Sequence, residues 1–275
     1  MSLENQSRPT VAILGAGAMG EALLSGLLTA GWTPDSIGVA ARRPERAEAV
    51  EAATGCRVSL DPVEAVAGRS VIVVATKPRD VAGLLDQIAK AVAPPQVVVS
   101  VAAGVPIQEF EKRLGEIAVV RAMPNTPALV GEAVTAVAAG THANEDAVEA
   151  AVSVLSAVGK VRRLDESLID AATAVSGTGP AYVFLLAEAL IEAAVREGLP
   201  RDVAETLVHQ TVRGAGHLLT DSDKNAAELR SQVTSPGGTT AAAVHVLEES
   251  GFRALVEDAV RAAAERARQL GSSPQ

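Results

Sequence analysis

Roughly the first 160 residues alternate short apolar runs with segments of helical periodicity. The runs are rich in Val, Ile and Ala, and in chain order they read TVAILGAG, SIGVAAR, RSVIVVATKP, QVVVSVAAG, IAVVRAMPN and AVTAVAAG. Continuous apolar strands separated by amphipathic helices, such as the one expected over 81–92, are typical of a parallel sheet covered on both faces. The pattern predicts a doubly wound α/β domain, Rossmann-like in architecture, over residues 8–163.

The rest of the chain lacks such runs and predicts an all-α domain over residues 164–271. Breaks between its helices are expected near 198–200, 221–224 and 235–238. One segment, GPAYVFLLAEALIEAAVREG (179–198), is apolar on nearly every face, so as a helix it requires cover on all sides. A domain of this size is too thin a shell to provide that cover, which predicts a dimerisation domain.

Composition narrows the classes of partner and the compartment. A net charge of -9 with only 2% aromatic residues argues against nucleic acid as a ligand. Cys56 is the only cysteine, which excludes an internal disulfide and a multi-cysteine metal site and favours the cytoplasm. The start, MSLENQSRPT, lacks an apolar signal-peptide core, and Gly177, Gly179 and Pro180 are expected to interrupt the longest uncharged stretch, 171–187. No membrane span is therefore expected.

The segment VAILGAGAMGEALLSGLL carries the first functional motif. Gly15, Gly17 and Gly20 follow a strand directly and open a helix, in the G-x-G-x-x-G arrangement of dinucleotide-binding domains. Gly15 permits the tight turn, Gly17 lets the backbone approach a pyrophosphate, and Gly20 lets helix and strand pack closely. The pyrophosphate would bind the free N–H groups of the helix start. A purely structural glycine turn is the alternative.

The next strand indicates which dinucleotide binds. Its end, where an NAD enzyme carries an acidic residue for the ribose 2′-hydroxyl, holds Arg42 and Arg43, and Asp35 lies before the strand. Two guanidinium groups suit a 2′-phosphate through charge-assisted hydrogen bonds. NADPH is therefore the expected cofactor, with NADH a weaker substitute. The alternative is a pair of surface arginines with no ligand.

Three later strand ends are expected to line the same crevice, because ligands of open α/β sheets lie outside the carboxyl ends of the strands. VVATKP ends one strand with Lys77, and Pro78 stops the strand from continuing. SVAAG and AMPNTPA end the others, which places Ala102, Ala103 and Met123 on the nicotinamide side. Asn125 is expected there too, or else closes a turn.

A second glycine loop lies in QVTSPGGTTAAAVHVLEESG, residues 232–251, where no strand precedes the glycines. A helix start offers unpaired N–H groups and a partial positive charge, which suits a carboxylate. Gly237 and Gly238 expose the backbone, and Thr239 or Thr240 adds a hydroxyl. The alternative is that Ser235 or Thr239 merely caps the helix, with a proline in its first turn.

AVSGTGPAYVF, residues 174–184, has a similar composition. Gly177, Gly179 and Pro180 are expected to open the long apolar helix, with Ser176 and Thr178 beside them. Two bare helix starts in one helical domain predict a shared pocket.

Taken together, the chain resembles the pyrroline-5-carboxylate reductase family. LGAGAMGEAL, ATKP, SVAAGV, RAMPNTPALVG, AVSGTGPAYVF and VTSPGGTTAAAVHVLEESGFR occur in the family's order and spacing across residues 10–270, and the last is the most specific. The resemblance implies NADPH-dependent reduction of 1-pyrroline-5-carboxylate to L-proline, by hydride transfer to the C5 imine carbon. It also implies a helical domain that interlocks with its mate into a homodimer, often assembled further into a ring of dimers.

The motifs and the resemblance together nominate two sets of site residues. The candidate cofactor contacts are Leu14, Gly15, Ala16, Gly17, Ala18, Met19, Gly20, Arg42, Arg43, Ala75, Thr76, Lys77, Pro78, Val101, Ala102, Ala103, Met123 and Asn125. The candidate substrate contacts are Ser235, Gly237, Gly238, Thr239 and Thr240, with Asp223 near the pocket rim. Many relatives carry an asparagine near the adenosine where this chain has Pro62, which puts one polar contact in doubt.

Thr240 is the candidate catalytic residue, expected to hydrogen-bond the ring nitrogen of the pyrroline. No His, Tyr or Lys stands at the matched positions as an obvious general acid, and His209, His217 and His245 fall in helical patterns. The substrate is therefore expected to bind as the iminium or to take its proton from water, so that catalysis rests on orientation.

Two other functions compete with this interpretation. A β-hydroxyacid dehydrogenase would use a lysine on a helix of the second domain, whereas the only lysine after Lys160 is Lys224, in a polar loop. A non-catalytic protein that binds NADP would bind NADPH without turning it over.

Overall fold

The computed structural model describes residues 8–272 and divides into two compact units. The first unit comprises the chain up to Thr178 together with the stretch from Ala263 onward, and the second comprises Gly179–Ala262. Residues 164–178 and 263–271, which the expected boundary at 163 assigns to the helical domain, thus group with the first unit. The absence of a signal-peptide core was inferred partly from residues 1–7, which lie outside the described residues.

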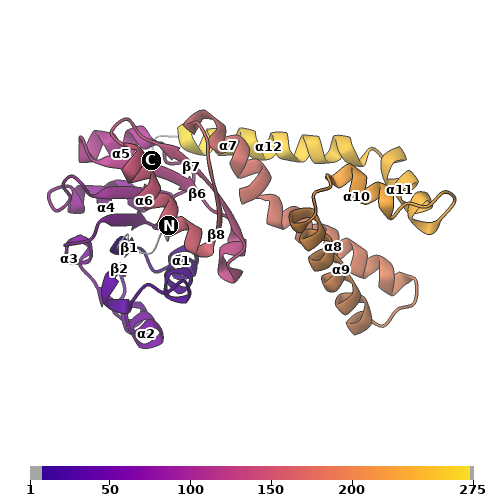
Figure 1. The fold of residues 1–275 in the computed structure, drawn as a ribbon, viewed down its shortest axis with the longest axis horizontal. Helices are drawn as coiled ribbons and strands as arrows, with labels where there is room; N and C mark the ends of the chain where they lie inside the picture. Colours follow the sequence, from indigo (N-terminus) through magenta and orange to yellow (C-terminus); the bar gives the residue numbers. More distant parts are fainter. Residues whose placement is uncertain (1–7, 273–275) are drawn as a thin grey trace, which may run out of the picture. The chain divides into compact units, whose positions relative to one another are not determined.

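The first unit is built on a single mixed sheet (Figure 1). Its strands are β1 (Val11–Leu14), β2 (Ile37–Ala40), β3 (Arg57–Ser59), β4 (Val71–Val74), β5 (Val97–Ser100), β6 (Ala118–Met123), β7 (Ala133–Ala139) and β8 (Gly159–Arg163). They lie in the order β3-β2-β1-β4-β5-β6-β7-β8. Every neighbouring pair is parallel except β6 and β7, which confirms the predicted α/β class.

The antiparallel pairing of β7 departs from the expected parallel sheet. Only the short 3-10 segment η2 (Thr126–Val130) lies between β6 and β7. Parallel neighbours need a crossover of a dozen or more residues, whereas a short connection can only fold the chain back on itself. The edge strands β3 and β8 were not predicted, because RVS is too short and GKVRR too charged to show strand periodicity.

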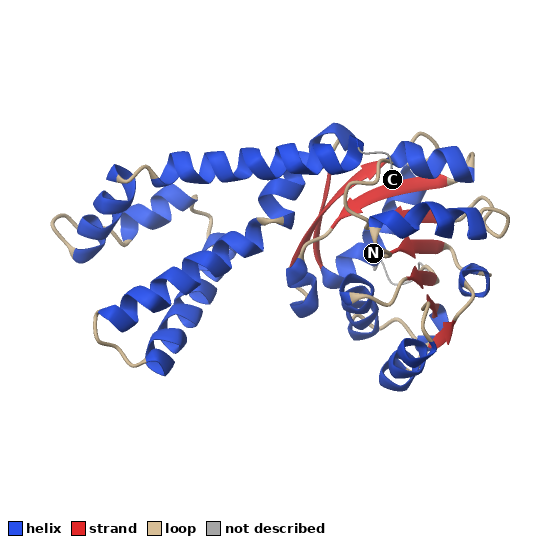
Figure 2. Ribbon diagram, turned by 180° about the vertical axis from the view of Figure 1, so that it is seen from behind, coloured by secondary structure: helices blue, strands red, loops and turns tan. Residues whose placement is uncertain are grey.

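Helices cover both faces of the sheet, as the continuous apolar strands predict (Figure 2). One face carries α1 (Ala18–Thr29), α2 (Pro44–Thr54) and α6 (Glu145–Leu155), and the other carries α3 (Pro62–Val66), α4 (Pro78–Ile88), α5 (Ile107–Leu114) and α7 (Ile169–Ala172). Successive strand side chains alternate between the two cores, so Val11 and Ile13 pack on one side and Ala12 and Leu14 on the other. Both faces of β1 are therefore fixed by packing.

A nearly buried arginine fastens residues 166–170 to the sheet. Arg121 of β6 is 8% exposed, its Nη1 donates to Glu166 Oε1 at 3.1 Å, and its Nη2 lies 3.5 Å from Asp170 Oδ1. The same Glu166 oxygen accepts a hydrogen bond from the backbone N–H of Ile107 at 2.8 Å. These contacts explain why the residues that follow β8 belong to the sheet unit.

The second unit contains α8 (Gly179–Arg196), α9 (Arg201–Asp221), α10 (Ala226–Gln232), α11 (Thr239–Glu249) and the first part of α12 (Phe252–Ser272). Helices α8 and α9 pack side by side around a small core of Ile191, Ala204 and Val208 (Figures 1 and 2). Most other apolar side chains of α8 are exposed, including Phe184 (65%) and Leu185 (66%). The described part of the chain leaves most of this helix uncovered.

Helix α8 begins at Gly179, as expected, but its start is not bare. Residues 166–196 follow one helical path, which passes through a π-helical segment, Thr173–Gly177, before α8. Pro180 has no N–H for the carbonyl of Ser176 four residues earlier, and that carbonyl instead accepts a hydrogen bond from Asn125 Nδ2 at 3.1 Å. Gly177 and Gly179 therefore lie within a continuous helical path. Of the two bare helix starts expected to form a shared pocket, only the one at residues 237–240 remains.

This continuity also removes the interruption that argued against a membrane span. The helix Glu166–Arg196, 31 residues, is long and apolar enough to cross a membrane by length and composition alone. Those two properties do not distinguish a spanning helix from one covered by other protein.

Candidate active site

The sheet register brings the predicted cofactor residues to one edge. Leu14 of β1 lies beside Ala40 of β2 and Val74 of β4, and Val74 lies beside Ser100 of β5. The backbone N–H groups of the next residues continue the ladder, since Gly15 donates to Ala40 and Ala75 donates to Leu14. The loops after four neighbouring strands thus begin in one row.

A cleft opens where the strand order reverses, between β1 and β4. The chain runs from β1 to β2 and β3 on one side, then returns to β4 on the other, which is where open α/β sheets bind their ligands. The cleft has a volume of about 970 Å³. Its lining residues are Leu14, Gly15, Ala16, Gly17, Ala40, Ala41, Arg42, Arg43, Arg46, Leu60, Pro62, Ala75, Thr76, Lys77, Arg79, Asp80, Gly83, Leu84 and Gln87.

The structure brings half of the predicted cofactor set together in this cleft. Nine line it, namely Leu14, Gly15, Ala16, Gly17, Arg42, Arg43, Ala75, Thr76 and Lys77. The nine others are not among its lining residues, namely Ala18, Met19, Gly20, Pro78, Val101, Ala102, Ala103, Met123 and Asn125. Contact between either set and a cofactor remains a prediction.

The glycine loop leaves a row of donors facing the cleft. The first hydrogen bond within α1 runs from Glu21 N–H to the carbonyl of Gly17, so the N–H groups of the preceding turn have no acceptor inside the helix. Gly15 has φ +117°, and a Cβ on Gly20 would lie 2.0 Å from the Gly15 carbonyl oxygen. A Cβ on Gly17 would meet nothing within 4 Å, because that position faces open space.

Charge in the cleft is opposite in sign to that of the chain. Among the described lining residues the cations are Arg42, Arg43, Arg46, Lys77 and Arg79, against one carboxylate, Asp80. The whole chain carries a formal charge of -9. This local excess of positive charge, beside free helix N–H groups, suits a ligand with several phosphates.

Two observations test whether the lining fits a dinucleotide with a 2′-phosphate. Thr76 Oγ1 is buried in the cleft wall and has no hydrogen-bond partner within the described chain. Arg43, the N-cap residue of α2, forms no ion pair within residues 8–272. The hydroxyl of Thr76 and the guanidinium of Arg43, in the same cleft as the open position Gly17, form a donor set of the required kind.

Arg46 is a cleft residue that the sequence did not reveal. Its Nε donates to the carbonyl of Ala16 at 3.0 Å, and its guanidinium also pairs with Glu21 of α1. Arg46 thereby ties α2 to the glycine loop. The signal available in the sequence was a third basic residue close to Arg42 and Arg43, in the first turn of the helix that follows them. Pro62, where relatives differ, also lines the cleft, at the first position of α3.

Met123 is the last residue of β6 and Asn125 follows that strand, on the same edge of the sheet. Asn125 is 8% exposed, its Oδ1 accepts a hydrogen bond from Val134 N–H at 3.0 Å, and its Nδ2 donates one to the Ser176 carbonyl. Those contacts correspond to the turn-closing alternative.

The second glycine loop also presents a bare helix start. Gly237 has φ +68°, and Gly238 is the N-cap of α11 with no side-chain cap. The first hydrogen bond inside α11 runs from Ala242 N–H to the carbonyl of Gly238, so residues 239–241 keep N–H groups without a helical acceptor. Neither Ser235 nor Thr239 caps the helix through its side chain, contrary to the capping alternative.

The other candidate groups of the helical unit lie at its surface. Asp223 is exposed in the turn between α9 and α10, next to Lys224. His217 and His245 lie on helices within 3.8 Å of Asp221 and Glu249 respectively. These pairs are one helical turn apart, which gives the two imidazoles an ordinary helix-surface environment.

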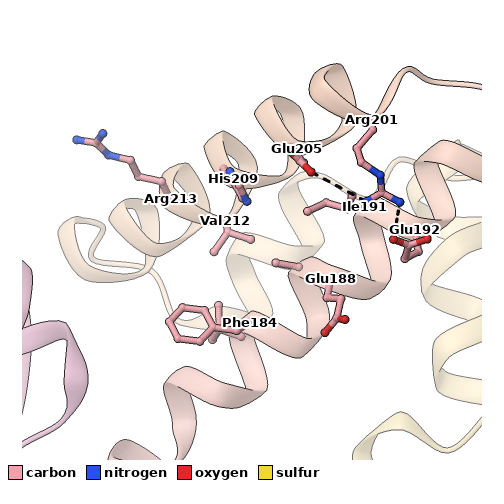
Figure 3. Close-up of a pocket in the computed structure, with 11 residues that line it drawn as sticks. Phe184, Glu188, Ile191, Glu192, Arg201, Glu205, His209, Val212 and Arg213 are labelled. Atoms are coloured by element: carbon pink, nitrogen blue, oxygen red, sulfur yellow. Dashed lines mark hydrogen bonds and ion pairs between the residues drawn. The ribbon is translucent and has the colours of Figure 1, made fainter.

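A second cavity, of about 560 Å³, lies between α8 and α9 (Figure 3). Phe184, Ile191 and Val212 line its floor, and Arg201 donates to Glu192 Oε1 at 2.8 Å at one end. That hydrogen bond lowers the pKa of Glu192. The apolar lining of the cavity comes from both helices, and the ionisable residues that line it are Glu188, Glu192, Arg201, Glu205, His209 and Arg213.

The fold and the first cleft define a class of protein, the dinucleotide-dependent oxidoreductases with a Rossmann-like domain and a helical second domain. Two family models agree with this division. Residues 10–104 match the family described as NADP oxidoreductase, coenzyme F420-dependent, and residues 166–270 match pyrroline-5-carboxylate reductase dimerisation.

Comparison with known proteins narrows the class to one family. Pyrroline-5-carboxylate reductase from Mycobacterium tuberculosis is 44% identical, over 96% of this chain and 98% of the relative. The structure of the Coxiella burnetii enzyme superposes with a TM-score of 0.93 at 34% identity, covering 97% of this chain and 100% of that one. The Plasmodium falciparum structure with NADP bound superposes with a TM-score of 0.85 at 30% identity, covering 98% of this chain and 100% of that one. The chain belongs to the pyrroline-5-carboxylate reductase family, which confirms the resemblance seen in its motifs.

Proposed function

We propose that the protein reduces 1-pyrroline-5-carboxylate to L-proline with NADPH, the last step of proline biosynthesis. The observation that carries the proposal is the basic cleft at the carboxyl edge of β1, β2 and β4, in a chain that matches curated reductases along nearly its whole length. NADPH bound there supplies the hydride for the C5 imine carbon. The bound NADP of the Plasmodium falciparum relative supports the same cofactor.

The residues of the cleft hold and orient the donor. The N–H groups at the start of α1 face the pyrophosphate, and Arg43 meets the 2′-phosphate. Lys77, which follows β4 on the other side of the glycine loop, adds positive charge along the path of the cofactor. The loops after β5 and β6, with Val101–Ala103 and Met123, lie toward the nicotinamide end.

The residues of the second glycine loop hold the acceptor. The N–H groups of residues 239–241 receive the substrate carboxylate, and the Thr240 hydroxyl hydrogen-bonds the ring nitrogen. No described His or Lys is assigned as proton donor, so the imine enters as the iminium or is protonated by water. The rate then depends on alignment, which can supply about 7–11 kcal/mol when two reactants are held in line.

The helical unit forms a homodimer in this proposal. Phe184, Leu185 and the groove between α8 and α9 present apolar surface that the chain leaves uncovered. A second copy of the unit covers this apolar surface with its own apolar side chains. The dimer forms in the cytoplasm and does not involve a membrane. Dimers assemble further into rings. Sedimentation analysis is expected to give at least twice the mass of one chain at micromolar concentration. A stable monomer would contradict the dimer.

Replacing Arg42 and Arg43 together by glutamine is expected to raise KM for NADPH by about tenfold or more, because each charged hydrogen bond to phosphate contributes roughly 1.5–3 kcal/mol. KM for NADH is expected to change little, since NADH lacks the 2′-phosphate. Steady-state kinetics with both cofactors measures the two values. An equal effect on both would refute the 2′-phosphate assignment.

An absorbance assay at 340 nm tests the activity itself. Purified protein with NADPH and pyrroline-5-carboxylate is expected to consume NADPH and form one proline for each NADPH oxidised. NADPH binding without proline formation would instead support the non-catalytic alternative. A β-hydroxyacid dehydrogenase is disfavoured because Lys224 lies in an exposed turn and not on a helix.

A further inference from the structure

We propose that Asp80 is a positioning residue for cofactor selectivity, and that its carboxylate holds Arg42 at the end of the cleft that takes the 2′-phosphate. The proposal rests on the proposed NADPH site. It adds a residue that no sequence motif contains, on a helix that follows a different strand from the one carrying the arginines.

The geometry places this ion pair across the cleft. Arg42 Nη1 lies 3.0 Å from Asp80 Oδ2. Arg42 follows β2, and Asp80 stands in the first turn of α4, which follows β4. Strands β2 and β4 flank β1, so the pair spans the carboxyl end of the strand that carries the glycine loop.

The exposed fractions of the two side chains show which member of the Arg42–Asp80 pair is held in place by its surroundings. The Asp80 side chain is 23% exposed and the Arg42 side chain is 72% exposed. Asp80 Oδ2 is buried and receives no aligned hydrogen bond from any described residue, so Arg42 is its principal partner. The N-terminal turn of a helix also favours a carboxylate. The carboxylate is thus the anchored group, and the loop arginine is the group that it orders.

The pair leaves donors free for a ligand. A guanidinium has five N–H groups, so an arginine held through Nη1 keeps Nη2 and Nε for a phosphate. Arginine loses rotamer freedom when it binds, and ordering it beforehand reduces that loss. Arg46 is already paired with Glu21, and Arg43 has no ion pair within the described chain, so Asp80 does not hold either of them.

Two features oppose the effect and shape its test. The negative charge of Asp80 repels a phosphate, although the contact with Arg42 neutralises much of that charge. Arg79 Nε also lies 4.0 Å from Asp80 Oδ1. A double-mutant cycle with Arg42 isolates the proposed contact from both.

The experiment uses calorimetry on the full-length protein with two probes that differ by one phosphate, adenosine 2′,5′-bisphosphate and adenosine 5′-monophosphate. Asp80→Asn is expected to weaken binding of the bisphosphate by about two- to fivefold, the upper part of the range for an exposed ion pair, and to leave binding of the monophosphate unchanged. In an Arg42→Gln background Asp80→Asn is expected to add nothing. Asp80→Glu is expected to restore part of the affinity. Asp86→Asn, on the exposed side of α4 beside Arg113, is the matched control.

The outcomes separate this inference from the proposed function. If the wild-type protein binds the bisphosphate no more tightly than the monophosphate, the NADPH site itself is wrong. The other case is that the wild-type protein binds the bisphosphate more tightly. In that case the positioning role is wrong if Asp80→Asn leaves the affinity for the bisphosphate unchanged, raises it, or lowers the affinity for both probes equally. Should Asp80→Asn fail to fold, Asp80→Ser takes its place, because serine is tolerated in the first turn of a helix, and the same outcomes apply to it.

Discussion

Gly20→Ala is expected to lower kcat/KM for NADPH roughly 100-fold, the loss expected when a reacting group is misplaced by about 1 Å. A Cβ there would lie 2.0 Å from the Gly15 carbonyl oxygen, which is backbone and cannot rotate away. Helix α1 or the glycine loop must therefore shift, and overpacking of this kind destabilises a fold by about 1–3 kcal/mol. Thermal unfolding and steady-state kinetics measure the two effects.

Gly17→Ala is the matched comparison within the same motif. A Cβ on Gly17 meets nothing within 4 Å, and the residue has an extended backbone that alanine adopts freely. The melting temperature is therefore expected to stay at the wild-type value while NADPH affinity falls, since the methyl group occupies the space left for the pyrophosphate. Wild-type NADPH kinetics in both variants would contradict a phosphate site at this loop.

Thr240→Ala is expected to lower kcat by about 10- to 100-fold, the loss typical of one hydrogen bond made in the transition state. Thr240 lies in the first turn of α11, half-buried, and its hydroxyl has no partner within the described residues. KM for NADPH is expected to change little, because the cofactor cleft is built by other residues. Single-turnover and steady-state rates with pyrroline-5-carboxylate measure the loss.

Two further substitutions separate the hydroxyl from the shape of Thr240. Thr240→Ser keeps the hydroxyl and is expected to retain most of the rate, whereas Thr240→Val keeps the shape and is expected to behave like alanine. Wild-type turnover in the valine variant would remove Thr240 from the mechanism.

Local patterns sufficed to predict the sheet unit and the first glycine loop. Runs such as VIVV and VVVS are buried on both faces, so their composition alone indicates central parallel strands. The register then brings Gly15, Arg42 and Lys77 to one edge without any long-range information beyond strand order. That is why half of the candidate cofactor set lines one cleft.

What the sequence did not predict depends on tertiary contacts. Asp80 and Arg46 acquire their roles from partners on other elements, Arg42 and Ala16. The helix through Gly177 and Pro180 persists because Asn125, distant in sequence, satisfies the Ser176 carbonyl. For Asn125 the sequence allowed a site residue or a turn residue, and its hydrogen bonds to Val134 and Ser176 depend on the tertiary fold.

The structure of the protein with NADP⁺ and L-proline bound together tests the account most directly. We expect the pyrophosphate against the N–H groups at the start of α1, and the proline carboxylate within roughly 2.7–3.2 Å of N–H groups at the start of α11, the ordinary hydrogen-bond range. The proline ring would then lie against the nicotinamide, near Thr240. A carboxylate bound far from residues 237–240 would contradict the account.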